Sequence, residues 1–149
     1  MPPFTTAERI RAVEGIIGYE FQEKSLLLKA LEAAGATAAS QGNKRLALIG
    51  DAALRLVLYE FGYEDQATIY DMTQAQNIRA TNQNLAQIGF TLGLDVYIQL
   101  NPSAQGVVPG RLMATTIEAI IGAVYLDCNK NIMVIRPLIL HLRVIPTLE

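Results

Sequence analysis

The sequence contains few of the residues that build most metal and redox sites. Its 149 residues include one cysteine, Cys128, and one histidine, His141. A single cysteine excludes an internal disulfide and is typical of a reducing compartment. Cys128 and His141 alone do not make a metal site or a catalytic dyad, so we interpret Cys128 as a small core residue.

A basic surplus is also missing. The chain has 12 lysine and arginine residues against 14 aspartate and glutamate residues, which gives a net charge of −2. Phosphate contacts dominate the affinity of proteins for nucleic acid, and proteins that depend on them usually carry excess positive charge. The charge therefore argues against strong, autonomous binding of RNA or DNA, although it leaves room for a local basic groove.

Long apolar runs and targeting signals are absent as well. No apolar run reaches the roughly 18 residues that a membrane helix needs. The opening segment, "MPPFTTAERIRAVEG", does not have the shape of a signal peptide. We expect an intracellular protein without a membrane partner, in the cytoplasm, nucleus or mitochondrion.

What the sequence does contain is helical periodicity. Hydrophobic residues make up 51% of the chain and charged residues 17%, enough for the core of one domain, which we place at residues 1–149. Thr5 to Glu8 match a capping box, and Gly18 is expected to end the helix that follows. Further helices are predicted at residues 24–36, 44–61, 68–92 and 112–126, before a last helical segment that Pro137 interrupts. No segment shows the alternation of a strand, so we predict an all-α fold.

Two segments carry a resemblance to a known family. They are "NKRLALIGDAALRLVLYEF", residues 43–61, and "MATTIEAIIGAVYLD", residues 113–127. The pair resembles the ribonuclease III domain, whose signature helix reads N-E-R-L-E-F-L-G-D-A-V-L and whose later helix reads D-x-x-E-A-L-I-G-A-x-Y-L-D. "IIGYEFQEKSLLLKAL" and "TNQNLAQIGFTLGLDVYI" are similar to two further family segments. Several motifs in the right order make the resemblance specific, and it covers nearly the whole chain.

The resemblance implies a chemistry and an assembly. Ribonuclease III domains cleave double-stranded RNA with Mg²⁺, which four carboxylates from the two motif helices hold. Mg²⁺ prefers oxygen ligands, and a clustered divalent ion activates water and stabilises developing negative charge. The domains work as homodimers, in which an aromatic residue of the signature helix often packs into the partner; Leu48 stands at that place here. Members commonly carry a separate double-stranded-RNA-binding domain, which is not found in these 149 residues.

Carried over position by position, the acidic site is incomplete. Asp51 matches the last acid of the first motif, and Glu118 matches the glutamate of the second. Ala47 and Thr115 stand where the family has its other two acids, and Lys44 replaces an additional one. Spacings of four and three residues place each pair of positions on one helix face. We therefore expect Asp51 and Glu118 to face the ancestral site, as the catalytic and metal-binding residues that remain.

Three functions are compatible with these residues. The first is a divergent ribonuclease III-like domain that binds or organises structured RNA with weak or no cleavage; inactive relatives in mitochondrial ribosomes suggest ribonucleoprotein partners by analogy. The second is an endoribonuclease of double-stranded RNA that uses Asp51 and Glu118 with Mg²⁺ or Mn²⁺. The third is a helical dimer with a small-molecule or protein-binding pocket at Ala47 and Thr115.

Structural interpretations compete with each functional one. Asp51 and Glu118 could bond to the backbone or to nearby basic side chains, and Lys44 is expected to be solvated, about 10 Å along the helix axis from Asp51. The helix rich in Asn, Gln and Thr at residues 73–87 could contact RNA or simply face solvent. The candidate RNA contacts are Arg45, Asn82 and Arg111.

Overall fold

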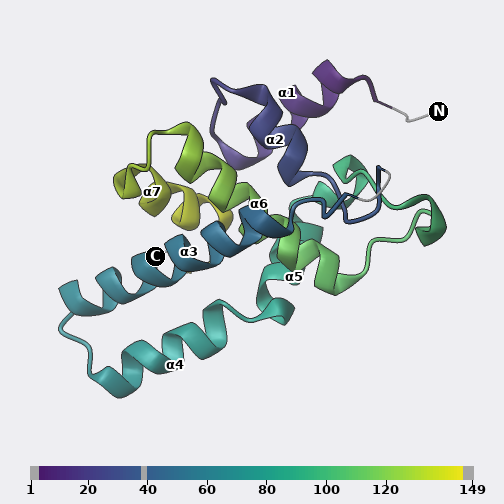
Figure 1. Ribbon diagram of the computed structural model, residues 1–149. Helices are drawn as coiled ribbons and strands as arrows, with labels where there is room; N and C mark the ends of the chain where they lie inside the picture. The colour runs from purple at the N-terminus through teal and green to yellow at the C-terminus, as the bar shows by residue number, and fades with distance from the viewer. Residues whose placement is uncertain (1–3, 38–39, 146–149) are drawn as a thin grey trace.

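The described part of the protein is helical. A computed structural model describes residues 4–37 and 40–145, so residues 1–3, 38–39 and 146–149 of the predicted domain lie outside the described residues. Within the described ranges the chain forms seven α-helices and two short 3-10 helices, which confirms the all-α prediction (Figure 1). The helices are α1 Thr6–Ile17, α2 Lys24–Ala30, α3 Lys44–Glu64, α4 Ile69–Arg79, α5 Asn82–Thr91, η1 Leu94–Tyr97, η2 Pro102–Ala104, α6 Gly110–Asp127 and α7 Ile132–Leu142.

The two helices that carry the family motifs form the centre of the fold. α3 packs against α6, α5 and α2 cover other faces of α6, and α4 and α7 pack against α3. Figure 1 shows α4 running back beside the long α3. α6 is buried over most of its length, from Met113 to Val124, as its nearly all-apolar sequence predicts. Within the described residues, no helix is long and apolar enough to cross a membrane.

The start of the chain follows its local signals. Thr5 accepts a hydrogen bond from the Glu8 backbone N–H at 3.1 Å, and Glu8 accepts one from the Thr5 N–H at 3.3 Å. This capping box begins α1 as predicted. Gly18 ends it with φ at 72°, a left-handed conformation that glycine adopts without strain.

Two of the predicted helices have the wrong bounds. α2 stops at Ala30 rather than near residue 36, because the backbone then pairs with Gln99: the Gln99 N–H donates to Leu31 O at 2.7 Å. The helix predicted at 68–92 is two helices, because Thr81 caps α5 and the Asn84 side chain donates to Arg79 O at 2.7 Å. These long-range and capping bonds replace helical ones.

The last helix also departs from its prediction. α7 continues through Pro137 instead of breaking there. Pro137 has no N–H to donate to the carbonyl of Met133. Because Met133 is 64% exposed, water can satisfy the freed oxygen. Ile135, Leu138 and Ile139 bury the other face of α7 and hold it in place. Cys128 is only partly buried, at the end of α6, so its interpretation as a core residue was wrong.

Asp127, the acid that ends the second motif, has a structural role. Its carboxylate accepts hydrogen bonds from Tyr19 Oη at 2.7 Å, from the Gln22 N–H at 2.9 Å and from the Glu23 N–H at 2.8 Å. A carboxylate with three donors is strongly held. Asp127 thus ties the end of α6 to the segment between α1 and α2, away from the residues that form the candidate site.

Candidate functional site

The site is built where α3 and α6 cross. Gly50 and Gly122 form the crossing: a Cβ added to Gly50 would overlap the carbonyl oxygen of Glu118, and one added to Gly122 would overlap the carbonyl oxygen of Leu46. Only glycine allows two helix backbones to approach so closely. Because Asp51 follows Gly50 directly, this contact places the two surviving acids on neighbouring segments.

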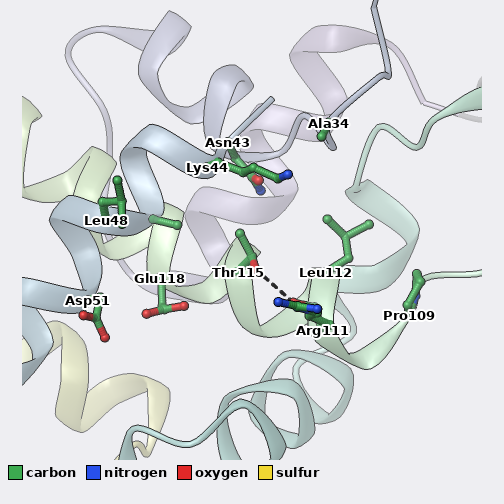
Figure 2. A pocket seen from close by; sticks show the side chains of 11 residues that line it. Ala34, Asn43, Lys44, Leu48, Asp51, Pro109, Arg111, Leu112, Thr115 and Glu118 are labelled. Carbon is green, nitrogen blue, oxygen red and sulfur yellow. Dashed lines mark hydrogen bonds between the residues drawn. The ribbon is translucent and has the colours of Figure 1, made fainter. Parts of the chain in front are cut away.

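Asp51 and Glu118 lie side by side at this crossing (Figure 2). Burial, and then the hydrogen bond and negative charge of Asp51, raise the pKa of Glu118 to about 7. The positive charge of Arg55, whose Nη2 lies 3.5 Å from Asp51 Oδ2, opposes this rise. The two carboxyl groups therefore share one site, and one of them holds a proton unusually tightly.

The three degenerate positions lie around the same site but offer little to a metal. Ala47 is buried, with 7% of its surface exposed, and contributes only a methyl group. Thr115 Oγ1 donates its proton to Arg111 O at 3.0 Å. Lys44 is exposed at the first position of α3, and the described part of the chain contains no ion pair between it and Asp51.

These side chains line one pocket of about 860 Å³. Figure 2 shows Asp51 and Glu118 at the left of the view, Lys44 above Thr115, and Arg111 below and to the right of Thr115. Its lining residues are Ala34, Asn43, Lys44, Ala47, Leu48, Asp51, Pro109, Arg111, Leu112, Thr115 and Glu118. Two acidic and two basic side chains thus line the same pocket.

The candidate RNA contacts divide into two groups. Asn82 and Arg111 lie together along a second hollow of about 500 Å³, and Arg111 also lines the pocket. Arg45 is exposed on α3 and lines neither. In the polar helix region, Gln76 is buried and donates to Arg55 O at 2.9 Å, so that residue supports the fold.

Sequence reasoning missed Asn43. It is 1% exposed, and its Nδ2 donates to Ala30 O at 2.8 Å and to Thr116 Oγ1 at 3.1 Å. Its Oδ1 accepts no hydrogen bond within the described residues, although Asn43 lines the pocket. The available signal was its place as the first letter of the signature motif, directly before Lys44.

The acids present fit a divalent metal only in part. Among residues 4–37 and 40–145, no group of three or more Asp, Glu, His or Cys side chains could hold a metal ion. Asp51 and Glu118 supply the oxygen ligands that Mg²⁺ prefers, and a cation would relieve the repulsion between them. A metal would need its other ligands from water or from a bound phosphate.

Comparison with known proteins identifies the family. A family model described as Ribonuclease-III-like matches residues 23–141. The chain belongs to the ribonuclease III-like family. Ribonuclease 3 of Shewanella woodyi is 36% identical over 121 residues, which cover 78% of this chain and 53% of that protein. Ribonuclease 3 of Idiomarina loihiensis is 31% identical over 145 residues, which cover 94% of this chain and 59% of that protein.

Solved structures agree with this family assignment. The nuclease domain of ribonuclease III from Campylobacter jejuni matches with a TM-score of 0.82 and 27% identity, covering 89% of this chain and 94% of that one. A second structure of that domain matches with a TM-score of 0.82 and 26% identity, covering 94% and 98%. The chain therefore has the ribonuclease III nuclease fold, and it spans about half the length of the curated relatives it matches, at 53% and 59%.

Proposed function

We propose that this ribonuclease III-like domain binds or organises structured RNA, within or outside a ribonucleoprotein, with weak or no cleavage. The observation that carries the proposal is the site itself: at the four acid positions that the resemblance implies, Asp51 and Glu118 face each other, while Ala47 has no ligand atom and Thr115 bonds to the backbone. Four carboxylates outweigh the charge of a dication, whereas two only balance it. Metal retention without substrate is correspondingly weak.

The second candidate is a metal-dependent endoribonuclease of double-stranded RNA. It is supported by the raised pKa of Glu118 beside Asp51, because perturbed carboxylates cluster at functional sites. Enzymes of this family use a divalent metal ion, and in this chain Asp51 and Glu118 would hold it. When bound, Mg²⁺ or Mn²⁺ would activate water and stabilise charge at the phosphate.

We also propose that the chain forms a homodimer through α3. Leu48 is 75% exposed, and with Leu56 it borders an apolar hollow of about 380 Å³ that Ala52, Tyr125 and Ile132 help to line. Exposed apolar side chains beside an apolar hollow are typical of a protein contact. The nuclease domain from Campylobacter jejuni, which shares this fold, has a flexible region that is involved in dimer formation.

The decisive experiment combines binding and cleavage. Purified protein is incubated with long double-stranded RNA in EDTA, in Mg²⁺ and in Mn²⁺, beside Asp51→Ala and Glu118→Ala. We expect a saturable gel shift in EDTA and no cleavage that depends on either acid. Metal-dependent cleavage that both substitutions abolish would establish the second candidate instead, and absence of a shift under every condition would refute RNA binding.

A gain-of-function variant tests the same reasoning from the other side. Ala47→Glu combined with Thr115→Asp returns carboxylates to both positions, and both residues line the pocket. We expect Mg²⁺ to raise the melting temperature of this variant more than that of the parent protein, since a ligand of the native state stabilises it. An equal rise in both would show that the lost acids do not limit metal binding.

A further inference from the structure

Two helices begin at the pocket without the caps that the other long helices have. Thr5, Thr68, Thr81 and Asn131 cap α1, α4, α5 and α7 with their side chains. α3 and α6, with 21 and 18 residues, have no side-chain cap and no acid in their first turns. The pocket lining includes Asn43 and Lys44 from one start and Pro109 and Arg111 from the other. Free backbone N–H groups at a helix start attract anions.

Basic side chains stand at both helix starts, where they are unfavourable for the helix alone. Lys44 is the first residue of α3, and Arg111 is the second of α6. A cation near the positive end of a helix dipole is repelled. Within the described residues, neither side chain forms an ion pair, and neither is compensated by a carboxylate of its own first turn. Residues that destabilise their own helix in this way are expected at functional sites.

Asn43 provides an independent indication of a ligand. It is 1% exposed and lines the pocket, and its Oδ1 lacks a hydrogen-bond donor within the described part of the chain. A buried polar atom without a partner costs free energy and calls for an explanation. A hydroxyl group bound beside Lys44 would supply the missing donor. The features together suit a molecule that carries both an anion and hydroxyl groups.

We infer that the pocket binds the phosphate group of a ribonucleotide through Lys44, Arg111 and the starts of α3 and α6, without a divalent metal. The inference rests in part on the proposed function, since the phosphate can belong to an RNA strand or to a free nucleotide. Figure 2 shows Asp51 and Glu118 to the left of both cations. Replacing family acids by Lys44 and Ala47 removes negative charge that would repel a phosphate beside Lys44.

The pocket is tested first with small ligands in EDTA. Adenosine 5′-monophosphate, inorganic phosphate and uncharged adenosine are titrated by calorimetry. We expect saturable binding of the monophosphate, weaker binding of phosphate and none of adenosine. Lys44→Ala and Arg111→Ala should each weaken binding about ten-fold or more, as loss of a charge-assisted contact implies. Lys44→Arg should retain it.

Arg11→Ala is the matched control. It removes the same charge from an exposed side chain of α1 that does not line the pocket. Its effect on monophosphate binding should be below about two-fold, as for a screened surface charge. Unchanged melting temperatures and circular dichroism establish that each variant is folded. Equal losses in Lys44→Ala and Arg11→Ala, or no saturable binding of the monophosphate by the parent protein, would overturn the inference.

Double-stranded RNA, again in EDTA, separates the two sources of phosphate. RNA binding that Lys44→Ala and Arg111→Ala weaken supports both the pocket and the proposed function. Monophosphate binding without RNA binding supports the pocket for a free nucleotide and refutes the proposed function. RNA binding that the two substitutions leave unchanged, or that requires Mg²⁺, overturns the pocket while leaving RNA recognition in place.

Discussion

The carboxyl pair makes the stability of this protein depend on pH in a predictable direction. Burial, and then the hydrogen bond and charge of Asp51, raise the pKa of Glu118 from its ordinary 4.5 to about 7. The folded protein therefore binds this proton more tightly than the unfolded chain does. The group's contribution is most favourable below about pH 4.5 and is lost as the pH rises through about 7. Glu118→Gln keeps the shape and can donate to Asp51 without the second charge.

The size of the effect follows from the same values. The interval from 4.5 to about 7 corresponds to about 3.5 kcal/mol at about 1.4 kcal/mol per pH unit. Glu118 is only partly buried and lines an open pocket, so solvent screening reduces the figure to about 1–2 kcal/mol. We expect Glu118→Gln to stabilise the protein by that amount at pH 8, or by roughly 3–6 °C in melting temperature. At pH 4.5 the difference should be close to zero.

Urea unfolding of both proteins at pH 4.5, 6 and 8 in EDTA measures the difference directly. Taking the difference between variant and parent cancels the titration of groups that do not interact with Glu118, so that the carboxyl pair accounts for what remains. Glu20→Gln, at an exposed glutamate outside the site, is the matched control and should show no pH-dependent difference. Destabilisation by Glu118→Gln at pH 8, or a difference that does not grow between pH 4.5 and 8, would refute the shared-proton description of the pair.

Three further predictions concern packing and assembly. Gly50→Ala should destabilise the protein by about 3 kcal/mol in chemical unfolding, because its methyl group would overlap the backbone of Glu118; Gly15→Ala, with nothing nearby, should not destabilise it. Leu48→Arg should shift the proposed dimer to monomer in analytical ultracentrifugation, and a dimer of unchanged affinity would place the interface elsewhere. Arg136→Ala should cost about 1–2 kcal/mol in thermal unfolding, since the guanidinium contacts Glu64 at 2.7 Å and stacks 4.3 Å above the Phe61 ring; a change no larger than that of an exposed arginine would contradict this.

The sequence predicted those parts of the fold that local signals determine. The capping box at Thr5 and Glu8, the left-handed Gly18 and the apolar α6 all depend on residues close in the chain. The errors lie where distant residues decide. α2 ends early because its backbone pairs with Gln99, which is far away in the sequence. Periodicity contains no information about such a partner.

The position of the site could be predicted from the sequence, but its protonation and the set of charges that line it could not. Motif spacing placed Asp51 and Glu118 together because both lie on faces that turn toward the helix crossing. The protonation of the pair depends on burial between the two helices, which no single helix pattern reveals. Lys44 and Arg111 line the same pocket only because α3 and α6 cross in space, and the spacing within either motif does not reveal this.

The same geometry explains how the acids could change while the fold was kept. The crossing is fixed by backbone contacts at Gly50 and Gly122, where any side chain would collide with a carbonyl group. The altered positions instead line the pocket, and two of them, Lys44 and Thr115, are not buried. Exchange of a carboxylate there changes charge and ligand capacity at little cost in packing. The helix crossing is therefore the constrained element of this domain, and the chemistry of the pocket is the variable one.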